Sequence, residues 1–172
     1  MTPDRRSLIE QALSQSREPI SAANLARRHG VSRQVIVGDI ALLRAAGHQI
    51  QATPRGYVLV RPAEAGFVGT IACRHDLARM QEELYTVVDL GGTVLDVIVE
   101  HAVYGQLVGQ LQVASRFDAD EFLARITEEN AQLLSSVTDG VHLHTVLCKD
   151  AEAFDRIRTA LDNRDLLYRT NP

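Results

Sequence analysis

The sequence predicts a two-domain α+β protein, with a small helical domain at the N-terminus and an open α/β sandwich after it. Residues 1–61 contain three segments with helical periodicity, followed by two short strand-like runs around Thr53-Pro54-Arg55-Gly56. Residues 67–172 mix strand-like segments and amphipathic helices with short connections. This mixture predicts a mixed or antiparallel sheet that carries its helices on one face.

The charge distribution separates the same two parts. Residues 1–62 carry nine arginines and four acidic residues, a net charge of +5, and the remainder carries nine basic and eighteen acidic residues, a net charge of −9. The overall charge of −4 conceals this asymmetry. A basic module joined to an acidic one is typical of a DNA-binding domain on a ligand-binding body.

The composition is that of an ordinary globular protein, with 45% hydrophobic and 23% charged residues in a chain of 172. No run of about 18 apolar residues and no charged-then-apolar leader is present, so we expect a cytoplasmic protein without a membrane span. Cys73 and Cys148 lack the spacing of a metal knuckle or a redox pair, which favours reduced thiols in the core.

Three helices are expected in the first domain, each preceded by a residue that can cap it. They are predicted over residues 5–17, 22–29 and 33–46, with Asp4, Ser21 and Ser32 as the respective N-caps. Pro19 should stop the first helix, and Gly30 and Gly47 should end the second and third.

Ala26, Gly30 and Ile36 have the spacing of a helix-turn-helix, in which a small residue lies at the helix crossing and glycine makes the turn. The Pro/Gly turn after the third helix predicts a β-hairpin wing. Residues 1–61 are therefore predicted to be a winged helix-turn-helix that binds DNA. They resemble the N-terminal domain of biotin-operon repressors and related regulators.

In such folds the start of the third helix enters the major groove. This places Ser32, Arg33 and Gln34 at base edges or neighbouring phosphates, and Arg55 on the wing at a phosphate or in the minor groove. Gly38 inside the third helix costs about 1 kcal/mol of helix propensity. It predicts a close approach of the helix to DNA or to the second helix.

The second domain, residues 67–172, follows a short linker over residues 62–66. Strands are expected over 67–73, 93–99, 107–113, 142–148 and 166–168, and helices over 77–89, 119–134 and 151–161, with Asp76, Asp118 and Asp150 as caps.

His142 and His144 alternate along one predicted strand, so both side chains stand on the same face of the sheet. Two neighbouring imidazoles suit a divalent transition metal, although a solvated strand face would carry them equally well. Helical periodicity turns Glu83 toward the edge of the core and Glu82 toward solvent, while His75 stands just before the same helix. Together these residues give a candidate set of three imidazoles and one carboxylate.

The order of motifs in this domain resembles the three-histidine domain of niacin-responsive repressors of NAD synthesis and niacin transport. The matching motifs are Arg74-His75-Asp76, Glu83-Leu84, Val87-Val88-Asp89-Leu90-Gly91-Gly92, Val97-Ile98-Val99-Glu100-His101, Val103-Tyr104-Gly105, Ser115 and Val141-His142-Leu143-His144. The family often has proline where Ala102 stands.

The resemblance implies one divalent transition metal per chain, held by His75, Glu83, His142 and His144. Zinc, nickel, iron and manganese all accept imidazole and carboxylate ligands. It further implies nicotinic acid as co-repressor. One winged head contacts only a short DNA half-site, so we expect a homodimer on a palindromic operator. His101 would bind the effector or be an ordinary hydrogen-bonded residue, and Arg74 or Tyr104 would complete recognition of the anion.

Two other functions fit parts of the sequence. An open histidine-rich site could activate water in a metal-dependent hydrolase, but the sequence gives no clear general base and the DNA-binding domain would have no purpose. The second alternative is a biotin-ligase-like regulator. The chain lacks the glycine- and arginine-rich adenylate loop of such proteins, and Lys149 does not lie in a segment of that kind. We therefore expect a repressor and not an enzyme.

Overall fold

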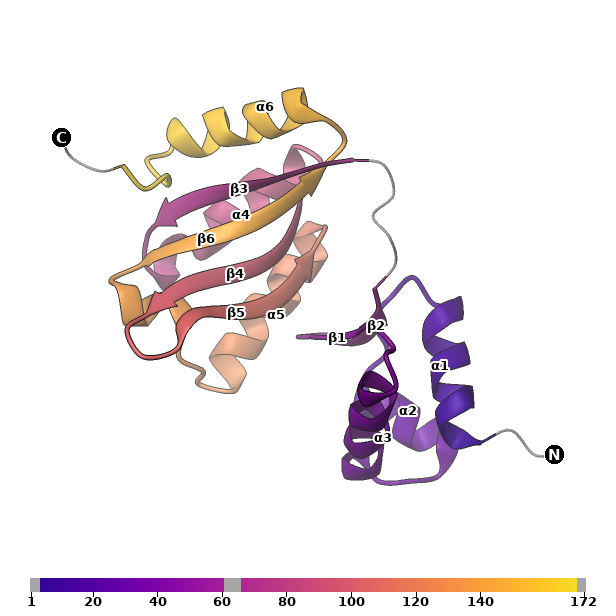
Figure 1. Ribbon diagram of the computed structural model, residues 1–172. Helices are drawn as coiled ribbons and strands as arrows, with labels where there is room; N and C mark the ends of the chain where they lie inside the picture. Colours follow the sequence, from indigo (N-terminus) through magenta and orange to yellow (C-terminus); the bar gives the residue numbers. More distant parts are fainter. Residues whose placement is uncertain (1–3, 61–65, 170–172) are drawn as a thin grey trace. The chain divides into compact units, whose positions relative to one another are not determined.

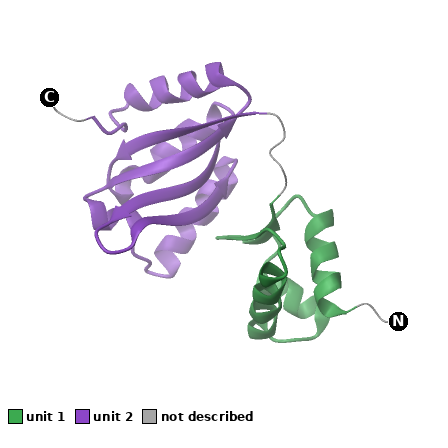
Figure 2. Ribbon diagram, viewed as in Figure 1, with its two compact units in different colours: residues 1–62 green, residues 63–172 purple. Residues whose placement is uncertain are grey.

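The computed structural model describes residues 4–60 and 66–169, and the chain divides into two compact units, residues 1–62 and 63–172 (Figure 2). The linker predicted over residues 62–66 lies outside the described residues except for Gly66. Among the described helices, none combines the length and apolar character needed to cross a membrane.

The first unit is three helices and a hairpin (Figure 1). Its elements are α1 (Arg5–Gln15), α2 (Ala22–His29), α3 (Arg33–Ala45), β1 (Ile50–Thr53) and β2 (Gly56–Leu59). The Ser21 and Ser32 side chains cap α2 and α3 by accepting the N–H groups of Asn24 and Val35. Gly30, at φ 63°, ends α2 in the left-handed conformation.

The predicted boundaries of this unit need small corrections. Helix α1 ends at Gln15 rather than Arg17 because the Ser16 hydroxyl binds the backbone of Glu18 and holds an extended turn before Pro19. Asp4 makes no capping bond and accepts a hydrogen bond from Arg6 instead. Helix α3 ends one residue earlier than predicted, at Ala45.

The buried interior of the first unit is aliphatic, with Ile9, Leu13, Leu25 and Ile36 almost fully enclosed. Asp39 of α3 is a buried charge, and the Arg5 guanidinium of α1 binds it through Nε at 2.6 Å. This pair fixes α1 against the helix that would contact DNA.

The second unit is a four-stranded sheet with helices on one face. Its elements are β3 (Phe67–Arg74), the 3-10 turn η1 (Leu77–Arg79), α4 (Met80–Asp89), β4 (Thr93–His101), β5 (Gly105–Val113), α5 (Arg116–Glu128), the 3-10 turn η2 (Leu134–Thr138), β6 (Val141–Cys148) and α6 (Ala151–Asp162). The strand order is β3-β6-β4-β5 with every pair antiparallel, which confirms the α+β class and selects the antiparallel form of the sheet.

Strand β6 lies in the middle of the sheet, paired with β3 on one side and β4 on the other. Its side chains alternate between half-buried and fully buried, and His142, His144 and Val146 share the buried face. The helices pack against this face: α4 and α5 lie behind the sheet in Figure 1, and Ile157 of α6 belongs to the same core. The two histidines are therefore held on a rigid central strand, inside the domain.

Several predicted ends in this unit are wrong for local reasons. Asp76 makes no capping bond, and the first turn after it is the 3-10 turn η1. Ser115, not Asp118, caps α5, because its hydroxyl accepts the Asp118 N–H while the Asp118 carboxylate accepts the N–H of Ala114. Helix α5 stops at Glu128 rather than Leu134, since Asn130 adopts φ 47°.

Two strand predictions also change. Strand β5 starts at Gly105, two residues before the predicted Leu107. The predicted last strand, 166–168, is an isolated bridge in which Leu167 pairs with Cys73.

Candidate metal centre and DNA-binding surface

The Glu83 carboxylate of α4 lies among three imidazoles. His75 Nε2 is 2.7 Å and His144 Nε2 is 3.3 Å from Oε2, and His142 Nε2 is 3.2 Å from Oε1. None of the four side chains is more than 4% exposed. The structure thus brings together the four residues that the sequence grouped, from α4, from β6 and from the turn after β3.

The orientation of each imidazole is fixed by a backbone carbonyl. Nδ1 of His75 lies 2.8 Å from the oxygen of Asp76, that of His142 lies 2.8 Å from Gly140, and that of His144 lies 2.6 Å from Asp96. A carbonyl oxygen can only accept, so each Nδ1 carries a hydrogen and donates it. Each Nε2 then presents its lone pair toward Glu83, which is the tautomer that metal-binding histidines adopt.

A break in the register of β4 supplies one of these carbonyls. Its pairing with β5 shifts between Val94 and Asp96, and its pairing with β6 shifts between Val94 and Ile98. The shift leaves the Asp96 carbonyl for His144 and lets the Asp96 carboxylate accept the Thr145 N–H. Sequence reasoning missed Asp96, although an acidic residue inside an apolar strand was a signal for such a role.

Lone pairs that face a carboxylate repel it unless a cation lies between them. Protonation of the imidazoles removes this repulsion, and the resulting charges shift the pKa values of the cluster. Burial by itself would raise the pKa of Glu83, but the charge of His144 and hydrogen bonds with His142 and His144 hold that pKa well below its usual range. Burial opposes protonation of His75 and His144, yet Glu83 raises the pKa of both.

A divalent metal would also remove this repulsion, and the donor set suits it. Three neutral imidazole nitrogens and one carboxylate are ligands for zinc, nickel and iron. His75 Nε2 is buried and makes no hydrogen bond, despite its short distance to Glu83. A buried ring nitrogen that makes no hydrogen bond has its lone pair available to bind a metal.

A pocket of about 380 Å³ lies beside the cluster, and its lining includes His75 but not Glu83, His142 or His144. Its other residues include Asp76 and, from the segment before β6, Gln132, Ser135, Ser136 and Asp139. A cavity of this size accommodates a small aromatic acid. This part of the lining was not predicted, because the preceding helix was expected to run to Leu134 and no element was expected over residues 135–140.

The three residues predicted to bind the effector lie in two places, Arg74 on β3 and His101 and Tyr104 at the end of β4 and the turn after it. Strand alternation places Arg74 on the opposite face of β3 from Cys73, so the structure does not support a role for it beside Glu83. His101, at the end of β4, accepts the N–H groups of Val103 and Tyr104 through Nδ1. Tyr104 is 74% exposed and contacts the His101 ring. The described contacts of His101 and Tyr104 belong to the β4–β5 turn.

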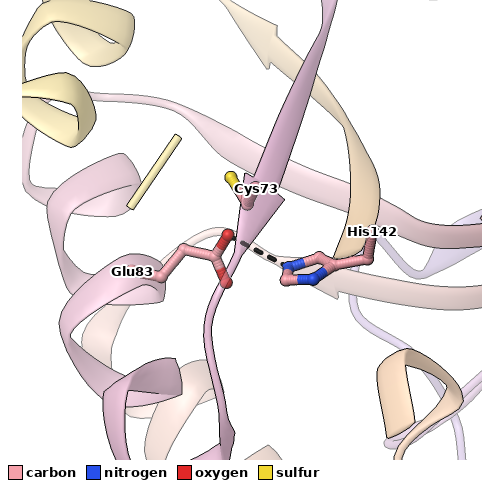
Figure 3. A group of neighbouring side chains, drawn as sticks. All are labelled: Cys73, Glu83 and His142. Atoms are coloured by element: carbon pink, nitrogen blue, oxygen red, sulfur yellow. Dashed lines mark hydrogen bonds and ion pairs between the residues drawn. The ribbon is translucent and has the colours of Figure 1, made fainter. Parts of the chain in front are cut away.

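Cys73 is the cluster residue that sequence reasoning missed. It is fully buried on β3, directly opposite His142 in the antiparallel register (Figure 3). Burial and the neighbouring Glu83 carboxylate raise the pKa of its thiol. Only the strand pairing, which periodicity does not reveal, brings it to this position.

The predicted DNA contacts lie at the start of α3 and on the wing. Arg33 and Gln34 are exposed in its first turn, and Ser32 is the N-cap. Gly38 is exposed, and a Cβ there would meet nothing within 4 Å, so the predicted close approach to α2 is wrong. Arg55 at the wing turn binds the Glu18 carboxylate at 2.9 Å. A phosphate would have to replace Glu18 to engage it.

Comparison with known proteins accounts for both units. Residues 5–58 match the model of a helix-turn-helix domain, and residues 68–170 match that of the 3H domain. The chain is 41% identical to the transcription repressor NadR of Bacillus subtilis, over 98% of this chain and 96% of that protein. It is 42% identical to the probable transcription repressor NiaR of Thermotoga maritima, over 95% of this chain and 93% of that one.

The chain belongs to this family of 3H-domain transcription repressors.

Membership confirms the fold predicted from the sequence and the prediction of a repressor that binds DNA through a helix-turn-helix. It also decides between the functional alternatives. The relatives are repressors, so the hydrolase alternative is not supported and the chain is a transcription repressor rather than an enzyme.

Proposed function

We propose that this 3H-domain repressor holds one divalent metal per chain and senses nicotinic acid, which acts as a co-repressor at genes of NAD synthesis or niacin uptake. One observation carries the metal part of the proposal. Three imidazoles, each with Nδ1 bonded to a backbone carbonyl, direct Nε2 at a single buried carboxylate. His75, Glu83, His142 and His144 would be the ligands.

The cavity beside His75 supports the sensing part. A bound metal would supply an electrophilic centre for a carboxylate or a pyridine nitrogen. The polar residues Gln132, Ser135 and Ser136 also line this pocket. The choice of nicotinic acid among small aromatic acids, and of NAD-related target genes, rests on the resemblance of the motifs described above.

Metal analysis of the purified protein tests the centre. We expect about one divalent transition metal per chain in the wild type, loss of metal in His142→Ala and His144→Ala, and weaker binding in Glu83→Gln. Glu82→Gln is the matched control, since Glu82 is the neighbouring residue on the solvent side and pairs with Arg79. Full occupancy in the double histidine variant would refute the site.

Three related compounds test the effector. Nicotinic acid, nicotinamide and benzoic acid differ in the carboxylate and in the ring nitrogen. Binding to an operator selected from random duplex DNA is measured at fixed salt with each compound. We expect nicotinic acid to tighten binding several-fold in the wild type and not in His142→Ala, and both analogues to be weaker. No effect of nicotinic acid on the metal-loaded wild type would refute the sensing proposal.

A further inference from the structure

Cys73 lies at the metal centre proposed above, on the side formed by β3. Its Sγ, a carboxylate oxygen of Glu83 and a ring nitrogen of His142 lie within 4.8 Å of one another, and all three residues are buried. Figure 3 shows the Cys73 sulfur and the His142 imidazole beside the Glu83 carboxylate, with the imidazole joined to it by a hydrogen bond. Because Cys73 and His142 are directly paired across β3 and β6, this placement is fixed by the sheet.

A second observation points to a cation at the same place. His75 Nε2 is enclosed and makes no hydrogen bond, although Glu83 Oε2 is only 2.7 Å away. An acceptor nitrogen and a carboxylate oxygen at that distance are stabilised by a positive charge that both can reach. Cys73 flanks the Glu83 carboxylate, so its sulfur borders the same position.

The charges of the candidate ligands favour participation of the sulfur. Three neutral imidazoles, the Glu83 carboxylate and a divalent metal leave one positive charge in a buried site. A thiolate cancels it, and an uncompensated charge in the interior is costly. Coordination would form a metal–sulfur bond and release the thiol proton to solvent, with no change of oxidation state.

The other cysteine provides the comparison. Cys148 pairs with Phe67 at the far end of the same two strands, and its Sγ lies 3.7 Å from the carbonyl oxygens of Phe67 and Asp150. It is a core thiol with backbone acceptors and no imidazole among its described contacts. The two cysteines therefore lie on the same pair of strands, Cys73 on β3 and Cys148 on β6, and both are buried, but only Cys73 is close to the histidines.

We propose that Cys73 is a thiolate ligand of the metal, in addition to the imidazoles and Glu83. This inference rests on the proposed metal centre and narrows the choice of ion. A sulfur ligand favours zinc, nickel or iron over manganese, which prefers oxygen ligands. Replacing Cys73 by serine should therefore weaken zinc binding about tenfold or more and leave manganese binding nearly unchanged.

Cobalt substitution of the full chain tests the ligand directly. The visible d–d bands of Co²⁺ report binding, and a near-ultraviolet charge-transfer band reports a cobalt–thiolate bond. We expect both in the wild type and in Cys148→Ser, and only the d–d bands in Cys73→Ser. X-ray absorption of the zinc-loaded wild type needs no variant, and should show sulfur at about 2.3 Å.

The outcomes separate the two proposals. Bound cobalt without the charge-transfer band, and zinc without a sulfur neighbour, would overturn the assignment of Cys73 and leave the histidine–glutamate centre standing. A wild-type protein that retains neither cobalt nor zinc would overturn the metal centre and this inference with it.

Discussion

At the scale of single residues, the cluster depends on which nitrogen of each histidine carries the hydrogen. A buried imidazole that donates through Nδ1 to a carbonyl has only Nε2 left to titrate or to bind a metal. His75, His142 and His144 all share this arrangement. Protons and metal ions therefore compete for the same three nitrogens, and the pH decides which of them prevails.

This competition predicts opposite pH responses with and without metal. In metal-free protein the raised pKa values of His75 and His144 stabilise the fold fully below the ordinary histidine pKa of 6.5, and that contribution is lost as the pH rises through the folded-state pKa. Glu83, with its pKa lowered from 4.5, stays ionised throughout this window. The melting temperature of chelated protein should then fall as the pH rises above about 6.5.

Metal-loaded protein should instead become more stable over the same window, since fewer protons oppose the ion. Thermal unfolding in matched buffers, with chelator or with excess zinc, gives both curves. Glu83→Gln should flatten the decline in chelated protein, because the partner charge is gone. Parallel curves for the two forms of the wild type would show that proton and metal do not share a site.

The sequence predicted some of these residues and could not predict others. Helical and strand periodicity placed Glu83 at the edge of the core, where the structure buries it fully, and His142 and His144 on one face. Asp96 and Cys73 were not predicted at the site, because a register shift places Asp96 there and cross-strand pairing places Cys73 there. Periodicity reports which face a side chain occupies, but not which residue of another strand lies opposite it.

At the scale of elements, the turn before β6 ties two ligands together. Gly140 has φ 83°, its carbonyl accepts from His142, and a Cβ on it would lie 2.6 Å from the His75 carbonyl oxygen. Gly91 has almost the same φ, 82°, but open space around it. Comparing alanine substitutions at Gly140 and Gly91 therefore separates the free-energy cost of the left-handed backbone from the cost of displacing His75.

Gly140→Ala and Gly91→Ala should both lose about 1 kcal/mol of stability from the left-handed backbone. Gly140→Ala should lose more, and should also weaken zinc affinity by about tenfold or more because two ligands shift. Gly91→Ala should bind zinc normally. Denaturant unfolding and zinc competition titrations measure the two effects, and equal zinc affinity in both variants would contradict the proposed coupling of the turn to the site.

The first turn of α3 is the element expected to read bases. Arg33→Ala and Gln34→Ala should weaken binding to the operator more than binding to random duplex, by about 1–3 kcal/mol for a lost base contact. Arg158→Ala is a control, since Arg158 is an exposed arginine of α6 in the other unit. Equal losses on both DNAs would assign these side chains to phosphates alone.

Gly38 gives a second test of the same helix. Because a Cβ there meets nothing in the protein, Gly38→Ala should stabilise α3 by about 1 kcal/mol through helix propensity. If the helix face packs against DNA, the same variant should bind the operator less tightly. Denaturant unfolding and operator titration of the same preparation measure the expected gain in stability and the expected loss of operator affinity. Unchanged operator binding would show that a close approach to DNA is not the reason for this glycine.

One element prediction failed where two polar residues competed for one cap. Ser115 and Asp118 both suit an N-cap, and reciprocal bonding made the serine the cap and put the aspartate in the first turn. The choice between a mixed and an antiparallel sheet was also open, since short connections permit either. Pairing of β6 between β3 and β4 is a long-range property that local patterns do not contain.

At the scale of the whole molecule, one helix-turn-helix contacts only a short DNA half-site, which gives little specificity by itself. We therefore propose a homodimer on a palindromic operator, as the sequence first suggested. Size-exclusion chromatography with light scattering should give twice the chain mass. Inserting about 5 base pairs between the half-sites should reduce binding to that of one half-site, because it rotates the second half-site to the opposite face of the duplex.

Binding of the lengthened operator as tightly as the original would contradict this arrangement. The dimer also limits what an effector can do. As the proposed effector, nicotinic acid would change operator affinity only by its preference for one form of the dimer, typically about 1–3 kcal/mol.

The ligands of the proposed centre are drawn from residues 75 to 144, whereas the elements of the first unit are complete by Leu59. During synthesis, domains fold from the N-terminus as the chain emerges. The helix-turn-helix can thus fold before His142 and His144 have been added. A nascent chain would acquire its DNA-binding surface well before its metal site, so a truncated product that ends ahead of β6 would be a repressor head without a sensor.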